Sequence, residues 1–188
     1  MNEVDLLVVP LYRLCRVEIK SRPGRVSGDA GTWTWADEGR TFTDDNPLLL
    51  ANRKAKKLKS LLQHQNALRN SRVPYIEPLI FLSAPSLRCE LEGAARHGIC
   101  VRQDNAREGF PDIVSVLSGV TDTTARSGSS PPQRIDRRLA QAIARALDQA
   151  GIRLSSHARQ VGDYRLGRLL MESNAYQDWE AAHVSFPN

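Results

Sequence analysis

Two stretches near the start of this chain, Asp5-Leu6-Leu7-Val8-Val9 and Cys15-Arg16-Val17-Glu18-Ile19-Lys20, decide its fold. The continuous apolar run of the first stretch predicts a strand that is buried on both faces. The second stretch alternates, so Glu18 and Lys20 lie on one face of a second strand. If the two strands pair as a hairpin, Asp5 lies beside Glu18 and Lys20.

These three residues suggest a metal site. Asp5 and Glu18 supply carboxylate oxygens, which Mg²⁺ or Mn²⁺ prefers, and the backbone carbonyl of Ile19 is a further candidate ligand. Such an ion stabilises charge on a phosphoryl oxygen and lowers the pKa of a bound water. Lys20 then orients that water or balances charge in the transition state. The alternative is an ordinary Glu–Lys pair on an exposed strand face, which stabilises little.

Composition favours an anionic partner. The chain has 188 residues, 41% of them hydrophobic, and a net charge of +5, which makes nucleic acid the first candidate. Cys15, Cys89 and Cys100 are widely spaced, which indicates free thiols in a reducing cytosol. No apolar run reaches the length of a membrane span, and the N-terminus lacks the basic region of a signal peptide. We therefore expect a cytoplasmic protein without a membrane partner.

A one-sided run of charge follows downstream. From Asn46 to Ile76 there are seven basic residues and no acid. Asn46 and Pro47 predict the cap and first turn of a helix that runs to about Leu68. Its buried stripe is predicted to contain Ala51, Ala55, Leu58 and Leu62. Its basic residues favour contact with a phosphate backbone, and a plain solvated face is the alternative. The candidate contacts are Arg53, Lys54, Lys56 and Lys57, with Arg22 and Arg25 from the turn-rich segment that follows Lys20.

The central part of the chain alternates between strands and helices. Thr32–Trp35 predicts a strand with both indoles on one face, where core packing is favoured and stacking on an unpaired base is the alternative. Tyr75–Leu82 and Ile99–Val101 predict two further strands, and a short helix is expected after Gly109–Asp112. This order predicts an α/β fold.

The C-terminal part has a different composition. Residues 119–133 are rich in Gly, Ser, Thr and Pro and predict a linker. A clean apolar stripe predicts a helix over about 134–150, which ends at Gly151. Two strands joined by a turn are expected over 164–170 and 176–181.

Several of these residues together carry a family pattern: Asp5-Leu-Leu-Val-Val, then Val17-Glu18-Ile19-Lys20-Ser21, then Gly24 and Gly28, then Asp45-Asn46-Pro47. The pattern resembles the NERD (nuclease-related) domain of the PD-(D/E)XK nuclease-like superfamily over about residues 1–118. The resemblance implies a restriction-endonuclease-like fold, with a central mixed β-sheet flanked by helices. It also implies metal-binding acids at Asp5 and Glu18, a catalytic lysine at Lys20, and Mg²⁺ or Mn²⁺ as cofactor.

The chain departs from the family pattern in two places. The family usually has a helix before the first strand, and we expect that helix to be missing here. The family also tends to carry a Gln shortly after the Asn-Pro pair, where this chain has Leu48, Leu49 and Leu50.

Residues 161–170, followed by 176–181, resemble the first β-hairpin of a protein-kinase domain. Met171, Ser173 and Ala175 stand where the kinase glycines are expected, which normally let the backbone approach ATP phosphates. No V-A-I-K, H-R-D or D-F-G motif follows, so this chain is not a functional kinase on its own. A NERD domain followed by a kinase is similar to the PglW-type proteins of BREX and Pgl phage-defence systems.

We therefore expect four parts: a NERD nuclease-like domain without its first helix (1–118), a linker (119–133), a helical connector (134–160) and the truncated start of a kinase-like domain (161–188). The main hypothesis is metal-dependent hydrolysis of DNA within a phage-defence NERD-kinase, with DNA and defence-system proteins as partners. The alternative is a catalytically weak or inactive module that binds DNA or regulates a larger kinase.

Overall fold

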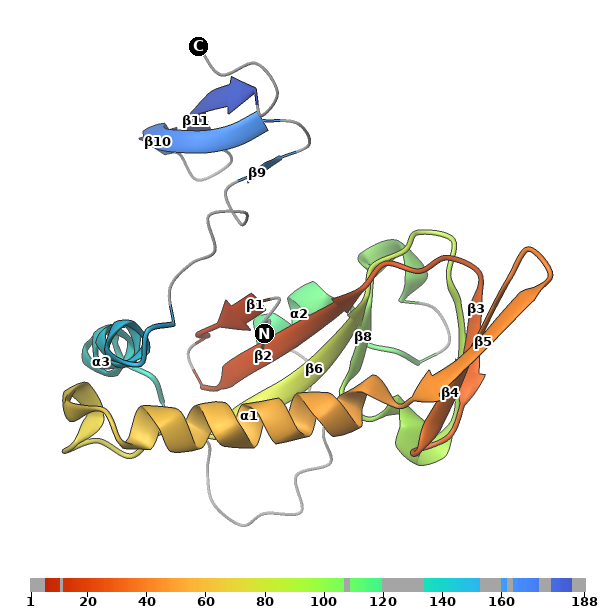
Figure 1. Ribbon diagram of the computed structural model, residues 1–188, viewed down its shortest axis with the longest axis horizontal. Helices are drawn as coiled ribbons and strands as arrows, with labels where there is room; N and C mark the ends of the chain where they lie inside the picture. The colour runs from red at the N-terminus through yellow and green to blue at the C-terminus, as the bar shows by residue number, and fades with distance from the viewer. Residues whose placement is uncertain are drawn as a thin grey trace. The chain divides into compact units, whose positions relative to one another are not determined.

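The computed structural model describes residues 6–10, 12–106, 109–119, 134–152, 160–161, 164–172 and 177–183. The chain divides into two compact units, residues 1–150 and 151–188. The first unit has helices packed on mixed sheets, as the predicted α/β class requires (Figure 1).

A four-stranded sheet forms the centre of the first unit, in the order β1-β2-β6-β8. β1 runs antiparallel to β2, whereas β2, β6 and β8 are parallel, so the sheet is mixed. The predicted hairpin is confirmed, with Leu6 opposite Val17. The strands are β1 (Leu6–Val8), β2 (Leu14–Lys20), β6 (Ile76–Leu82) and β8 (Ile99–Val101).

The prediction that the first strand is buried on both faces was wrong. β1 lies at the edge of the sheet, and Leu6 and Val9 are 44% and 38% exposed. A short apolar run indicates that a strand contacts the core, but it does not show how many neighbours the strand has.

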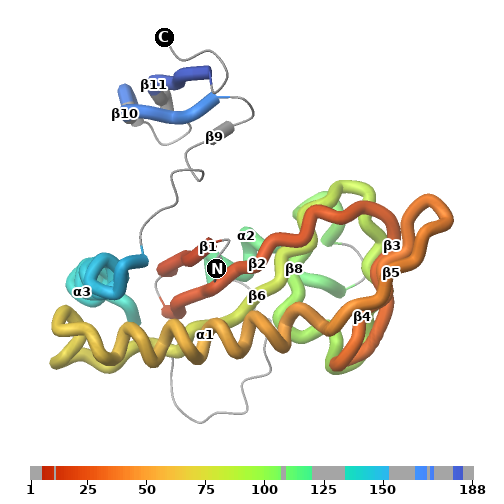
Figure 2. Tube along the Cα trace, viewed as in Figure 1, coloured from red at the N-terminus to blue at the C-terminus, as the bar shows by residue number. Residues whose placement is uncertain are grey.

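The two faces of this sheet pack against different helices. Cys15 and Val17 share an apolar cluster with α2 (Ile113–Leu117) on one face. α1 (Pro47–Gln63) packs along β6 and β2 on the other face (Figure 2). Since Glu18 pairs in register with Ile80, which packs with Ala51 of α1, the Glu18 face of β2 is the face that α1 covers.

A second sheet, in the order β5-β4-β3-β7, packs against the same core. Trp33 and Trp35 of β4 are 0% and 7% exposed, and their ring centroids lie 6.2 Å apart. This burial confirms the packing interpretation of the two indoles and leaves no open ring face for a base. The strands are β3 (Arg25–Gly28), β4 (Thr32–Asp37), β5 (Arg40–Asp45) and β7 (Arg88–Leu91).

Three strands of this second sheet escaped the sequence analysis. β3 lies in the segment interpreted as turn-rich, and every residue of β5 is exposed. β7 has a single buried residue, Leu91. Strands without an apolar alternation give no periodic signal. β3 and β5 pair with β4, which has such an alternation, and β7 pairs with β3.

Helix α1 begins where the sequence predicts. Asn46 caps it, with Oδ1 accepting the Leu48 N–H at 2.9 Å and Nδ2 donating to the Ala30 carbonyl at 3.0 Å. The buried residues of α1 are the predicted ones, Ala51, Ala55, Leu58 and Leu62. The helix ends at Gln63 rather than near Leu68, and a separate 3-10 turn, η1 (Asn66–Leu68), follows.

The remaining elements follow the predicted order. α3 (Arg137–Gln149) packs against η1 and α1, and most of the predicted linker, residues 120–133, lies outside the described residues. The second unit holds an antiparallel sheet of β9 (Gln160–Val161), β10 (Tyr164–Glu172) and β11 (Gln177–His183), which includes the predicted hairpin. Within the described part of the chain, no helix is both long and apolar enough to cross a membrane.

The close approach of β3 to β4 requires a glycine at position 24. Its φ is 90°, and a Cβ at this position would collide with the carbonyl oxygen of Ala36. We expect Gly24→Ala to lower the free energy of unfolding by about 3 kcal/mol, because backbone strain and collision act together.

The matched control is Gly39→Ala, in the turn between β4 and β5. Gly39 has a φ of 77°, but the space that a methyl group would enter is open. This variant should lose only about 1 kcal/mol, the cost of the left-handed backbone alone. Urea unfolding of both variants checks this, and equal losses would contradict the proposed collision.

Candidate functional site

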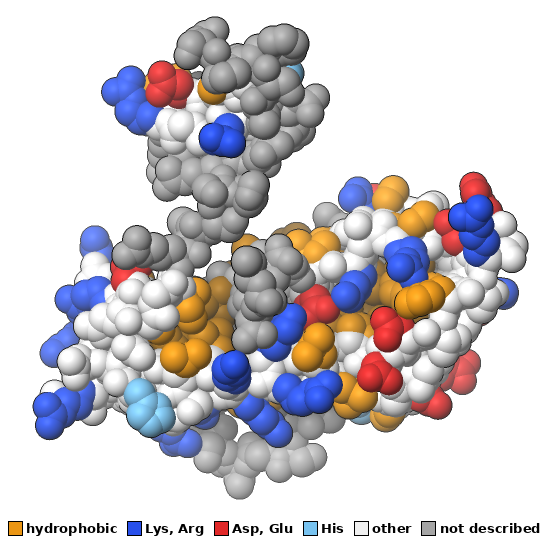
Figure 3. Space-filling view, in the orientation of Figure 1, with side chains coloured by type: hydrophobic (Ala, Val, Ile, Leu, Met, Phe, Trp, Pro, Cys, Tyr) orange, Lys and Arg blue, Asp and Glu red, His pale blue; other side chains and the backbone are white. Residues whose placement is uncertain are grey.

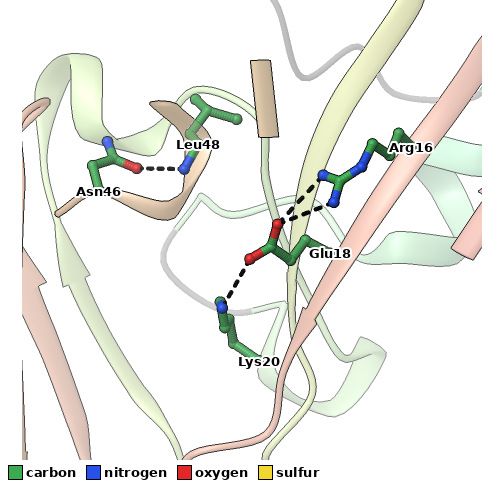
Figure 4. A network of polar contacts seen from close by, with 5 residues as sticks. All are labelled: Arg16, Glu18, Lys20, Asn46 and Leu48. Atoms are coloured by element: carbon green, nitrogen blue, oxygen red, sulfur yellow. Dashed lines mark hydrogen bonds and ion pairs between the residues drawn. The ribbon is translucent and has the colours of Figure 1, made fainter. Parts of the chain in front are cut away.

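Three charged residues alternate along β2 on the face covered by α1: Arg16, Glu18 and Lys20 (Figure 4). The Glu18 carboxylate uses both oxygens. Oε2 accepts hydrogen bonds from Nη1 and Nη2 of Arg16, each at 3.3 Å, and Oε1 lies 2.9 Å from Nζ of Lys20. The structure therefore brings the predicted Glu18 and Lys20 together.

Arg16 is a site residue that the sequence analysis missed. It is fully buried, and Glu18 is 6% exposed. A guanidinium stays protonated in proteins, so a buried one requires a nearby anion, and Glu18 supplies it. The signal was present in the sequence, because Arg16 stands two residues before Glu18 and therefore on the same strand face.

A third cation approaches from α1. Burial raises the pKa of Glu18, but the hydrogen bond and charge of Lys20 and the charges of Arg16 and Lys54 outweigh it, so the pKa lies below its ordinary value. Lys54 is half-buried. The carboxylate is thus ionised at neutral pH, and three cations surround it.

The Asn46 cap positions this third cation. The Asn46 N–H donates to the carbonyl of Gly31 at 2.8 Å, and its side chain donates to Ala30, so the start of α1 is fixed to the turn before β4. The helix rises 1.5 Å per residue, which places Lys54 about 12 Å along α1 from the cap. The Asn46–Pro47 pair therefore affects the site indirectly, because it fixes where α1 begins.

The basic residues of α1 divide between two flanks. Lys57 lies three residues after Lys54, so both side chains are on the flank that adjoins Glu18. At about 100° per residue, Lys56 and Lys59 fall on the opposite flank, and Arg53 lies near the outer crest. Figure 3 shows Lys and Arg side chains along α1, with acids gathered toward the second sheet. The predicted contact residues of α1 therefore do not share one surface, because Lys54 and Lys57 lie on the flank beside Glu18 and Arg53 and Lys56 do not.

The other two predicted contact residues have partners elsewhere. The guanidinium of Arg22 stacks over Phe42 and Trp35, at 4.8 and 5.6 Å from the ring centroids. Arg25 lies 3.7 Å from the carboxylate of Glu90. Arg25 therefore adds little net charge to this surface, whereas Arg22 keeps its charge on an aromatic support.

The structure places only part of the predicted metal site. Asp5 lies outside the described residues, and the ligand predicted at Ile19 is its backbone carbonyl, not its side chain. Among the residues that are described, no three His, Cys, Asp or Glu side chains gather as metal ligands would. Arg16 and Lys20 occupy both oxygens of Glu18, and their charges repel a dication. The described residues alone therefore do not form a site for Mg²⁺ or Mn²⁺.

The leucines that replace the family's Gln have two roles. Leu48 packs against the apolar core. Leu49 and Leu50 are 44% and 42% exposed. Leu50 lies four residues before Lys54, so it adds apolar surface beside the basic flank.

Comparison with known proteins relates the part of the chain that contains this site to one family. The family model of the nuclease-related domain, NERD, matches residues 1–83. This match includes β1 to β6, the Arg16–Glu18–Lys20 array and all of α1. Residues 1–83 thus match the NERD family, which confirms the resemblance over this range.

A longer relative is similar along the entire chain. The "Probable kinase PglW" of Streptomyces coelicolor is 31% identical over 189 aligned residues, which cover 100% of this chain and 11% of that protein. The chain therefore corresponds to a small part of its relative. None of the solved structures matches the chain significantly.

The buried pair gives a stability test. Glu18→Gln keeps the shape of the side chain but places a neutral amide against the buried guanidinium of Arg16. We expect the free energy of unfolding to fall by about 3 kcal/mol. Lys20→Met removes a partner that is 37% exposed and should cost less than about 1 kcal/mol. Chemical denaturation measures both variants, and a smaller loss for Glu18→Gln than for Lys20→Met would contradict this ranking.

Proposed function

We propose that the NERD domain of this chain binds the phosphate backbone of nucleic acid, and DNA in particular, along the flank of α1 that adjoins β2. The observation that carries this proposal is the charge around Glu18. One carboxylate lies among Arg16, Lys20 and Lys54, and α1 itself contains no acid. A surface with such an excess of cations attracts a polyanion by releasing its counterions.

The exposed cations are the ones available for contact. Arg16 is buried and serves Glu18, whereas Lys20 is partly exposed, Lys54 is half-buried and Lys57 is exposed. Their ammonium groups extend from two different elements, the end of β2 and the middle of α1. A backbone phosphate that approaches this flank meets lysines from both sides, which no single surface charge provides.

Phosphodiester hydrolysis is the second candidate function. The adjacency of Glu18 and Lys20 in a nuclease-related domain favours it. It would require Asp5 and Glu18 to hold Mg²⁺, whereas both oxygens of Glu18 already contact cations, Arg16 and Lys20. Binding therefore ranks above hydrolysis.

The wider setting of the domain is also part of the proposal. The similarity to a protein named as a probable kinase, together with the β10–β11 hairpin, supports a DNA-binding or regulatory module of a larger kinase. We place that kinase in the cytoplasm and in a phage-defence system, where DNA and other defence proteins would be its partners.

Binding of a labelled DNA duplex, followed by fluorescence anisotropy between about 50 and 200 mM salt, tests the proposal. Three lysine–phosphate contacts predict a slope of log K against log salt near −3. The double variant Lys54→Gln, Lys57→Gln should lose about two units of that slope and about tenfold in affinity.

The matched control is Lys56→Gln, Lys59→Gln. It removes the same charge from the same helix, and each pair combines one exposed and one half-buried lysine. This control should change affinity by less than about threefold, which corresponds to general screening alone. Equal losses in the two double variants would show that net charge, not the β2 flank, attracts the DNA.

A cleavage assay in Mg²⁺ separates the two candidate functions. We expect the unmodified chain to leave the duplex intact under conditions in which it binds. Cleavage that disappears in Lys20→Ala, a variant that should still fold, would instead promote hydrolysis to the leading function.

A further inference from the structure

We infer that Arg16 is the resident cation of this site, so that the site binds phosphate without a divalent metal ion. This inference rests on the proposed nucleic-acid binding and identifies the cation that meets the Glu18 carboxylate. Its ligand class is a nucleic-acid phosphate, bound in the absence of Mg²⁺.

The geometry of Oε2 is the first argument. Both terminal nitrogens of Arg16 lie 3.3 Å from this single oxygen (Figure 4). A Mg²⁺ ion bound through this oxygen would have to approach it to about 2.1 Å. The guanidinium already occupies that side of the carboxylate, and two positive groups on one oxygen repel each other.

The burial of Arg16 is the second argument. Its backbone lies between β1 and β6, opposite Leu7 and Pro78, and its side chain is fully buried. An entering metal could not displace the guanidinium into water. Lys20 is different, because it is 37% exposed and can leave, but Oε1 would then be a single ligand atom beside the buried Arg16.

The surrounding charge is the third argument. Among the described residues, Arg16, Lys20 and Lys54 surround the one carboxylate of Glu18, so these four groups together carry a positive charge. A dication would raise this charge further, whereas a phosphate would lower it. The same arrangement therefore disfavours Mg²⁺ and favours the nucleic-acid backbone.

Arg16 acts through Glu18 and is a positioning residue. The paired carboxylate holds Nζ of Lys20 at 2.9 Å, on the flank where the phosphate is bound. A purely structural role for Arg16 would leave the metal dependence of binding unchanged, so metal dependence is the informative readout.

The first measurement uses the unmodified chain and the labelled duplex. Affinity is compared in EDTA and in Mg²⁺ at matched ionic strength, and we expect the two values to agree within about threefold. A loss of about tenfold or more in EDTA would overturn the inference while leaving nucleic-acid binding in place. Absence of binding in both buffers would contradict the proposed function, and the second measurement then decides the inference alone.

The second measurement is calorimetric titration with Mn²⁺ alone. We expect no uptake by the unmodified chain or by Lys20→Met at millimolar Mn²⁺, and a new site in Arg16→Met that is lost when Glu18→Gln is added. Uptake by the unmodified chain that depends on Glu18 would overturn the inference. If Arg16→Met does not fold, Lys20→Met decides, because a Mn²⁺ site in that variant would show that Arg16 does not exclude the metal.

Discussion

The pairing of Arg16 with Glu18 inside the central sheet is the contact on which the site depends. A guanidinium with no exposed surface needs an ionised partner, and both terminal nitrogens reach one carboxylate oxygen. That contact fixes the orientation of Glu18, and the second oxygen then holds Lys20. The site is thus organised around the Glu18 carboxylate, which contacts a cation through each of its oxygens.

Helix α1 converts this local arrangement into a surface. Its apolar stripe packs on β6 and β2, and the Asn46 cap fixes its start to the turn before β4. These two constraints fix the position of Lys54 beside β2, and Lys57 lies about one turn further along the helix. A basic helix alone would attract any polyanion. Because α1 is fixed beside β2, its basic flank has a defined neighbour, the end of β2.

Much of this could be predicted from the sequence, and the failures have physical reasons. The hairpin, the cap at Asn46 and the buried stripe of α1 depend on local periodicity and were predicted correctly. The edge position of β1 and the strands β3 and β5 depend on pairing partners, which periodicity does not reveal. Arg16 was missed because a charged residue inside a buried strand becomes interpretable only when its partner is known. The division of the lysines into flanks required knowing which strand adjoins each side of α1.

The NERD match over residues 1–83 relates this chain to a nuclease-related family, and the proposed binding uses the cations gathered around Glu18. The most direct measurement is an anomalous difference map from crystals of this chain soaked in Mn²⁺. The account predicts no peak at Glu18, with Arg16 and Lys20 still on its two oxygens. A peak within about 2.2 Å of either Glu18 oxygen would contradict it and would return the site to metal-dependent chemistry.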